Sequence, residues 1–450
     1  MGIVDDLVAR GVPVLTDPES VIVARTDRSG VAPDGKPRGV VRAESVDDVV
    51  ATLRAAHAHR VPVVPRGAGS GLAGGALAGA ETLVLDVSGL NRILEIDPVD
   101  GIAVVEPGVI TAELDRAAGE HGLRFAPDPA SARISTVGGN IATNAGGMRC
   151  VRYGTTGQSV LGLDVVLADG TRVSTGRRTV KGVSGFDLTA LLVGSEGALG
   201  VIVGATVQLL PRPEQTVTLA AGFDDVGAAA RACSAVARRR ANPALLELLD
   251  HATLTVVDRA QGSDHSERSR ALVIAQTEGV AAREEAAIIG EVFGEEARWC
   301  ETSTDDESVE VLVAARRLAL PSIEEYGRAL IEDICVPRSR LPEAFDAISE
   351  IGRQHGVDVF GFAHAGDGTI HPILSFDRNE PQVPAAVSAA ADDIFGLAID
   401  LGGTVSGEHG IGVLKRDWLA REIGPESLAV QRAIKDALDP RGILNPGKGI

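Results

Sequence analysis

Three histidines and one glutamate late in the sequence have the residue types and spacing of a metal site with a neighbouring base. His364 and His371 stand on either side of a Gly-Asp-Gly turn at 366–368, which would bring both imidazoles to one place. Glu408 and His409 follow in a second glycine-rich stretch. Two imidazoles and one carboxylate suit Zn²⁺ or Mn²⁺ and leave coordination positions open for a substrate. From spacing alone, histidines that are hydrogen-bonded in a core explain the pattern equally well.

Three glycine-rich stretches, 66–75, 135–147 and 194–201, could bind a nucleotide. The first follows a strand-like run, and dense glycines let backbone N–H groups approach a pyrophosphate. A Rossmann site is not indicated, because barely one helical turn fits after the loop and Asp86 arrives too early. A P-loop is excluded because no Gly-Lys-Ser/Thr closes the stretch. A flexible turn stays open for the first stretch alone, whereas three stretches together favour a surface for phosphates and a flavin ring.

The glycine-rich stretches stand in an order that resembles a known flavoprotein family. The likeness is carried by Arg-Gly-Ala-Gly-Ser-Gly-Leu at 66–72, the stretch 135–147, Tyr-Gly at 153–154, the stretch 194–201 and Asn-Pro-Gly-Lys at 445–448. Together these motifs resemble the vanillyl-alcohol oxidase type of FAD-binding fold. Within it they resemble the group of the glycolate oxidase FAD subunit, D-lactate dehydrogenase and D-2-hydroxyglutarate dehydrogenase. The resemblance implies an α+β fold, with a FAD-binding domain of two subdomains and a ferredoxin-like α+β substrate domain.

The resemblance implies that FAD is bound by residues of the glycine-rich stretches and by one residue near the C-terminus. The expected cofactor residues are Arg66, Gly67, Ala68, Gly69, Ser70, Gly71, Thr136, Gly138, Gly139, Asn140, Thr143, Asn144, Gly146, Glu196, Gly200, Val201 and Asn445. Relatives that attach FAD covalently use a histidine in the first glycine loop. The stretch 66–75 has no histidine, so non-covalent FAD is expected.

The same resemblance implies roles for the histidine-rich segments. Positions matching His364, His371 and Glu408 bind a divalent metal, Zn or Mn, and the position matching His409 is the catalytic base. The metal would lower the pKa of the substrate hydroxyl, and His409 would take its proton. A hydride would then leave to flavin N5, which makes the protein a FAD-dependent oxidoreductase acting on CH–OH groups.

The expected substrate is a small D-2-hydroxy acid, glycolate- or D-lactate-like, that is oxidised to the 2-oxo acid. Arg316 matches the arginine that binds the substrate carboxylate through a bidentate fork. Arg317 is the neighbouring alternative, and either arginine could be a solvated helix residue. Where D-lactate and D-2-hydroxyglutarate dehydrogenases carry Lys-Tyr-Asp before a proline, this chain has Ile-Glu-Asp at 331–333. The missing lysine favours a substrate with one carboxylate.

Two other functions stay open. One is a non-redox flavoenzyme resembling alkylglycerone-phosphate synthase, although the run of adjacent histidines of that group is absent here. The other is a FAD subunit that only relays electrons within a complex.

The hydrophobic pattern predicts the helices and strands that would position these residues. Ser45 and Asp48 form a capping box before an apolar stripe, which predicts a helix over 45–59. Further strands are expected over 61–64, 82–87, 101–107, 162–168, 216–223, 245–249 and 271–276, and helices over 225–239 and 281–293. The alternation after Pro213 predicts a separate domain whose sheet is covered on one face. The expected parts are an N-terminal segment 1–35, a FAD-binding domain 36–213, a substrate (cap) domain 214–405 and a C-terminal segment 406–450 that returns to the FAD site.

Composition limits the class of protein and its partners. A chain of 450 residues, 44% of them hydrophobic, is expected to form two or three globular domains. The net charge of −19 excludes the basic surface that non-specific nucleic-acid or anionic-membrane binding needs. With no signal-peptide pattern and no membrane-spanning run, a cytoplasmic protein is expected. The four cysteines lack iron–sulfur spacing, so electrons must leave to O₂, a quinone, an electron-transferring flavoprotein or a partner subunit. A homodimer stays an open alternative.

Overall fold

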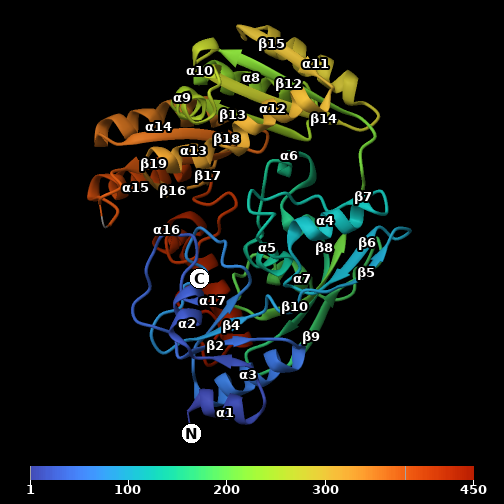
Figure 1. Ribbon diagram of the computed structural model, residues 1–450, viewed down its shortest axis with the longest axis vertical. Coiled ribbons are helices and arrows are strands. Elements are labelled where there is room, and N and C mark those ends of the chain that lie inside the picture. The colour runs from blue at the N-terminus through green and yellow to red at the C-terminus, as the bar shows by residue number, and fades with distance from the viewer. Residues whose placement is uncertain (1, 381) are drawn as a thin grey trace. The chain divides into compact units, whose positions relative to one another are not determined.

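The computed structural model describes residues 2–380 and 382–450, which pack as two compact units (Figure 1). The first unit comprises residues 2–146, 155–212 and 408–450. The second unit comprises residues 147–154 and 213–407, apart from residue 381. These units are defined by packing alone, and the expected division of the chain by function stays a prediction.

The first unit begins with a four-stranded sheet in the order β1-β2-β4-β3. Strands β2, β4 and β3 run parallel, and β1 is antiparallel to β2. Ser45 and Asp48 form the expected capping box at the start of helix α3, which packs Leu53 into the core. Strand β3 delivers the chain into the first glycine-rich stretch. The elements are α1 (Ile3–Ala9), β1 (Val14–Leu15), α2 (Pro18–Ala24), β2 (Gly39–Arg42), α3 (Val46–His59), β3 (Val63–Arg66) and β4 (Leu83–Asp86).

A second sheet of the first unit has five antiparallel strands in the order β5-β6-β10-β8-β9. One helix here, α5, lies inside the glycine-rich stretch 135–147, where the sequence pattern predicts no helix. Thr136 starts α5 by accepting the Gly139 N–H at 3.2 Å, and Val137 and Ile141, one turn apart, are fully buried. The elements are β5 (Ile93–Asp97), β6 (Ile102–Val105), α4 (Thr111–Gly119), β7 (Leu123–Arg124), α5 (Val137–Thr143), η1 (Thr156–Ser159), β8 (Val160–Val166), β9 (Arg172–Gly176), α7 (Leu188–Leu192), β10 (Val201–Gln208) and β11 (Leu210–Pro211).

The late segment 408–450 completes the first unit. It contains α16 (Arg416–Ile423) and α17 (Pro425–Leu438). Beyond α17, Leu444 pairs in parallel with Val63 of β3, and the Asn445 N–H donates to the Val63 carbonyl at 2.8 Å. Residues almost 400 positions apart in the sequence therefore lie side by side next to the first glycine-rich stretch.

The second unit is built on one antiparallel sheet in the order β15-β12-β14-β13-β18-β19-β16, with β17 also pairing with β19. Its first three strands in sequence agree with the strands expected over 216–223, 245–249 and 271–276. Strands β18 and β19 form a hairpin whose turn is the Gly-Asp-Gly segment. The strands are β12 (Thr216–Phe223), β13 (Leu245–Asp250), β14 (Ala271–Glu278), β15 (Trp299–Ser303), β16 (Arg328–Ile331), β17 (Ile334–Cys335), β18 (Asp358–His364) and β19 (Thr369–Phe376).

Helices cover both faces of this sheet, whereas the sequence pattern predicts one covered face. On β13, Leu245 and Leu249 pack into a core with side chains of α9, α12 and α13. Leu246 and Leu248 point to the other face, because side chains alternate along a strand, and they are also buried. Helices α8 and α11 pack against the strands there (Figure 1). The helices are α6 (Cys150–Tyr153), α8 (Val226–Arg238), α9 (His251–Gln261), α10 (His265–Arg268), α11 (Ala282–Gly294), α12 (Asp306–Arg317), α13 (Ala319–Tyr326), η2 (Arg338–Arg340), α14 (Leu341–His355) and α15 (Ala385–Asp400). Among the described residues, no helix has the length and apolar character to cross a membrane.

Candidate active site

His364 and His371 lie on the two strands of the β18–β19 hairpin. In the strand register His364 is opposite Thr369 and Phe362 is opposite His371. The two histidines are therefore diagonal neighbours on the same face of the sheet. Their ring centroids are 5.0 Å apart, and both side chains are buried. The hairpin thus brings together the two imidazoles that the sequence singled out.

Glu408 completes a group of three side chains that could bind a metal ion. It directly follows Gly407, which packs so closely on β19 that a Cβ there would lie 2.7 Å from the Thr369 side chain. His364, His371 and Glu408 each offer one ligand atom, and these atoms lie within 4.8 Å of one another. Ligand distances of about 2.0–2.2 Å to Zn²⁺ would require only small side-chain rotations. The donor set therefore fits a Zn²⁺ or Mn²⁺ ion, and His409 is the next residue of the chain.

A buried carboxylate that the sequence analysis did not single out, Glu247, joins His364 to Arg316. Glu247 lies on β13 directly opposite His364 of β18. Its two oxygens accept from the His364 ring Nδ1 at 2.8 and 2.9 Å, and Oε2 accepts from Arg316 Nε at 2.6 Å. The sequence carries one signal for it, because a single acid stands in the otherwise apolar run Leu-Leu-Glu-Leu-Leu.

Glu247 remains a carboxylate despite its burial. Only 1% of its surface is exposed, and burial by itself would raise its pKa. The electrostatic interactions and hydrogen bonds with His364 and Arg316 more than offset the burial and lower the pKa of Glu247 below its usual value. The chain therefore keeps an anion in the core between a candidate metal ligand and a candidate substrate ligand.

Arg316 and Arg317 end helix α12 in different environments. Arg316 is 8% exposed and its guanidinium lies 4.2 Å from the centre of the Phe362 ring, whereas Arg317 is exposed. The bond from Nε to Glu247 is the only hydrogen bond of Arg316 to the described residues. Its two terminal nitrogens can therefore still bind a substrate carboxylate as a fork. This geometry favours Arg316 over Arg317 as the substrate residue.

The three glycine-rich stretches and Asn445 converge within the first unit. Gly67 lies so close to α5 that a Cβ there would be 2.4 Å from the Thr136 hydroxyl. The Glu196 N–H donates to the Ala142 carbonyl at 2.8 Å, which joins the third stretch to the second. The Asn445 side-chain amide donates to the carbonyls of Gly75 and Glu196 at 2.9 and 2.7 Å. The structure therefore gathers these segments at one place.

The other predicted cofactor residues lie in the same segments. The loop after β3 contains Ala68, Gly69, Ser70 and Gly71. Helix α5 and the residues just after it contain Gly138, Gly139, Asn140, Thr143, Asn144 and Gly146. Gly200 directly precedes β10, and Val201 is the first residue of that strand. Several of the predicted side chains make internal contacts, among them Arg66, which donates to the Thr26 carbonyl at 2.7 Å. The Asn140 amide donates to Thr111 at 2.7 Å, and the Glu196 carboxylate accepts the N–H groups of Ile411 and Gly412 at 2.7 and 2.9 Å.

Three of the six described non-glycine residues with positive φ lie in these segments. Asn144, Glu196 and Asn445 have φ values of +51°, +50° and +42°, in the left-handed region that non-glycine residues seldom adopt. Each such residue costs on the order of 1–3 kcal/mol and persists where surrounding contacts fix it, commonly at ligand sites. Three strained residues in converging segments are consistent with a cofactor site.

Lys448 gives the converging segments a buried positive charge. Its side chain is 7% exposed, and its Nζ donates to the Asn445 side-chain oxygen at 2.9 Å. No other hydrogen bond from this nitrogen reaches the described residues. Burial lowers the pKa of Lys448 to about 8. A buried cation beside glycine loops fits an anionic ligand, and the residues present therefore fit the pyrophosphate of FAD.

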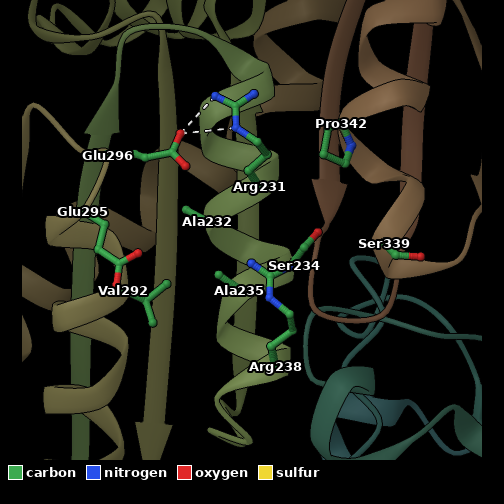
Figure 2. A pocket seen from close by; sticks show the side chains of 10 residues that line it. All are labelled: Arg231, Ala232, Ser234, Ala235, Arg238, Val292, Glu295, Glu296, Ser339 and Pro342. Atoms are coloured by element: carbon green, nitrogen blue, oxygen red, sulfur yellow. Dashed lines mark hydrogen bonds and ion pairs between the residues drawn. The ribbon is translucent and has the colours of Figure 1, made fainter.

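Two hollows lie within the separate units. One of about 300 Å³ in the first unit is lined mainly by apolar side chains and reaches Ser195 and Glu196. The other, of about 200 Å³, lies in the second unit beside α8, where Arg231 pairs with Glu296 (Figure 2). None of the residues that line the second hollow is a candidate site residue.

Comparison with known proteins identifies the class of enzyme. Residues 212–449 match the family described as "FAD linked oxidases, C-terminal domain", and residues 37–176 match "FAD binding domain". The chain belongs to the FAD-linked oxidase family, and it is a FAD-dependent oxidoreductase. The family and the α+β fold expected from the sequence are confirmed.

Individual relatives cover most of the chain. It is 39% identical to the glycolate oxidase subunit GlcD of Bacillus subtilis, over 92% of this chain and 88% of the relative. It is 36% identical to the D-lactate dehydrogenase of Archaeoglobus fulgidus, over 91% and 90% of the two chains. The solved structure of p-cresol methylhydroxylase has a TM-score of 0.80 at 18% identity, over 99% of this chain and 96% of that chain. That of alkyldihydroxyacetonephosphate synthase has a TM-score of 0.76 at 18% identity, over 99% and 84%. These two structures share the fold.

Proposed function

We propose that this protein oxidises a small D-2-hydroxy acid, glycolate- or D-lactate-like, to the 2-oxo acid. The observation that carries the proposal is the group of His364, His371 and Glu408, with ligand atoms within 4.8 Å of one another. Relatives named glycolate oxidase subunit and D-lactate dehydrogenase support the substrate class. When bound, FAD accepts the hydride from the substrate carbon, and a divalent ion lowers the pKa of the substrate hydroxyl.

The protein side chains bind the substrate and take its proton. The free fork of Arg316 binds the carboxylate through charge-assisted hydrogen bonds. His409 accepts the hydroxyl proton, a step for which an imidazole is suited near neutral pH. His364, His371 and Glu408 hold the Zn²⁺ or Mn²⁺ ion. The glycine-rich segments of the first unit hold FAD without a covalent bond.

The proposed substrate has one carboxylate. Ile331, which stands where D-lactate and D-2-hydroxyglutarate dehydrogenases carry a lysine, lies on β16 and packs against the apolar core of the second unit. An aliphatic side chain there offers no charge to a second carboxylate. Glycolate and D-lactate therefore fit better than 2-hydroxyglutarate.

Anaerobic reduction of the flavin tests this function directly. Purified protein is mixed with glycolate, D-lactate, L-lactate and D-2-hydroxyglutarate, and the loss of flavin absorbance is followed without an acceptor. Bleaching by a D-2-hydroxy acid or glycolate is expected. Flavin that dithionite reduces but no hydroxy acid does would instead support an electron-relay subunit. The acceptor is then identified by reoxidation with O₂, a quinone, an electron-transferring flavoprotein or a partner subunit.

A further inference from the structure

We propose that Glu247 is a positioning residue that sets metal affinity through His364 and substrate affinity through Arg316. The inference rests on the proposed function, since it concerns the same site. It assigns a role to a side chain that is not one of the three proposed metal ligands and acts through His364 and Arg316. We infer this role because the single carboxylate of Glu247 contacts both His364 and Arg316.

The contact with His364 fixes which ring nitrogen faces the metal. Oε2 of Glu247 already accepts from Arg316 Nε and both Glu247 oxygens face the same ring nitrogen of His364, so Nδ1 is the nitrogen placed to donate to them. Both Glu247 oxygens lie within 2.9 Å of that nitrogen. The lone pair of a neutral His364 is then on Nε2, which is the nitrogen that would bind an ion. Carboxylates that orient metal-binding histidines in this way also make them more basic ligands.

The contact with Arg316 fixes the direction of the guanidinium fork. Glu247 takes only the Nε proton, at 2.6 Å, while the Phe362 ring supports the guanidinium plane at 4.2 Å from its centre. These two contacts hold the plane and leave the terminal nitrogens to a ligand. Phe362 also lies against the second histidine, with its ring centroid 5.1 Å from that of His371. Any movement of Glu247 is therefore transmitted to both ligand groups.

Stability alone is a poor explanation for this buried charge. Glu247 stands among four leucines in a strand that is buried on both faces. Replacing a buried ionic group by apolar residues of similar volume is often neutral or stabilising. The strand nevertheless carries a carboxylate at the one position of β13 that is opposite His364. That placement is what a positioning role requires.

The decisive variant is Glu247→Gln, which keeps the size and shape of the side chain. Its single carbonyl oxygen can still accept from Arg316, but the amide NH₂ then faces His364. A neutral His364 would have to turn its lone pair to that NH₂ and move its proton to Nε2, where it blocks the ion. We expect Zn²⁺ affinity, measured by competition with a chelator in the absence of substrate, to fall about 10- to 100-fold. FAD content should not change.

Two further variants separate positioning from structure. Glu106→Gln removes another buried carboxylate, which pairs with Arg92 in the first unit and contacts no histidine. We expect it to lower the melting temperature without changing Zn²⁺ affinity. Glu247→Asp keeps two acceptor oxygens on a shorter side chain. We expect it to recover part of the Zn²⁺ affinity lost in Glu247→Gln while raising KM for the hydroxy acid.

The outcomes distinguish this inference from the proposed function. Wild-type protein that binds no Zn²⁺ or Mn²⁺ and still reduces its flavin at full rate would remove the metal from the proposed function. If the wild type binds the ion and folded Glu247→Gln binds it equally well, the positioning role is overturned and the function stands. If Glu247→Gln loses its FAD, the positioning role is tested with Glu247→Asp instead. Unchanged Zn²⁺ affinity and KM in that variant would overturn the inference, and a loss in both would support it.

Discussion

At the scale of single residues, two adjacent arginines of the candidate site, Arg316 and Arg317, have different surroundings. Arg316 is held between Glu247 and Phe362, whereas Arg317 beside it is exposed. The resemblance assigns the substrate carboxylate to Arg316 and leaves Arg317 as the neighbouring alternative, because residue type alone does not decide which helix position is buried. Glu247 escaped prediction for a related reason. Its partner His364 is 117 residues away in the sequence, and only the pairing of β13 with β18 makes them neighbours.

Arg316→Lys should raise KM for the hydroxy acid roughly 10- to 100-fold. Lysine keeps the positive charge but loses the two-pronged geometry, and hydrogen bonds to charged groups contribute about 1.5–3 kcal/mol. Steady-state kinetics measure the effect, with Zn²⁺ content and FAD content as checks on integrity. Arg317→Lys is the matched control and should leave KM within about twofold. A larger effect of Arg317→Lys would show that the substrate residue is the other arginine.

His409→Ala and His371→Ala should separate the base from a metal ligand. Loss of a general base costs about 10²–10⁴ in rate, so His409→Ala should reduce its flavin slowly under saturating substrate while keeping its Zn²⁺. His371→Ala should lose Zn²⁺ and retain FAD. Anaerobic stopped-flow reduction and elemental analysis of the same samples measure both quantities. Metal loss in His409→Ala, or full metal content in His371→Ala, would require the roles to be reassigned.

At the scale of helices and strands, capping residues and apolar runs in the sequence predicted most of the elements. They did not predict which elements pack against one another. The capping box at Ser45 and the apolar runs of β12 and β14 were sufficient to place α3 and those strands within a few residues. Helix α5 was missed because its two glycines conceal the buried pair Val137 and Ile141. The second covered face of the large sheet was missed because apolar residues on both sides of a strand do not reveal how many helices cover them.

Asp250 should make the stability of the second unit depend on pH. Its carboxylate caps α9 by accepting the Thr253 N–H and joins it to β18 by accepting the Gly361 N–H, each at 2.8 Å. Burial raises the pKa of Asp250 from 3.8 to about 6, and these hydrogen bonds offset the rise only in part. Because the folded pKa is the higher one, the stability from this group is present below pH 4 and is lost as the pH rises through about 6.

The measurement compares wild type with Asp250→Asn, which cannot titrate. The free energy of unfolding of the wild type minus that of the variant should fall between pH 4 and pH 6 and then stay level. Taking the difference cancels the titration of the other carboxyl groups. A difference that is constant, or that grows with pH, would contradict the raised pKa.

At the scale of the whole molecule, each unit has a hydrophobic core of its own. Leu53 and Leu83 belong to a core of the first unit, where the glycine-rich segments converge, and Leu249 and Phe362 belong to that of the second unit. The sequence motifs predict which parts of the chain bind FAD and which bind the hydroxy acid, and this division stays a prediction. They could not predict that the short segment 147–154 packs with the second unit, because the Tyr-Gly motif at 153–154 carries no information about long-range packing.

The purified protein should be yellow, and acid or heat should release its FAD into the filtrate. No histidine stands in the glycine-rich loop 66–75, and the contacts that gather the segments are all non-covalent. Absorbance and chromatography of the filtrate identify the flavin. Colour that remains with the precipitated polypeptide would indicate a covalent bond, and FMN in the filtrate would contradict a dinucleotide site.

The pairing of Val63 with Leu444 has a consequence for how the protein is made. The strand that leads into the first glycine-rich loop finds this neighbour only after the whole second unit has been synthesised. At about 5–20 residues per second, that interval lasts on the order of tens of seconds on the ribosome. During this time the second unit can fold on the nascent chain, while Val63 still lacks its pairing partner Leu444. The proposed contact of Asn445 with FAD can therefore form only after translation has passed this residue.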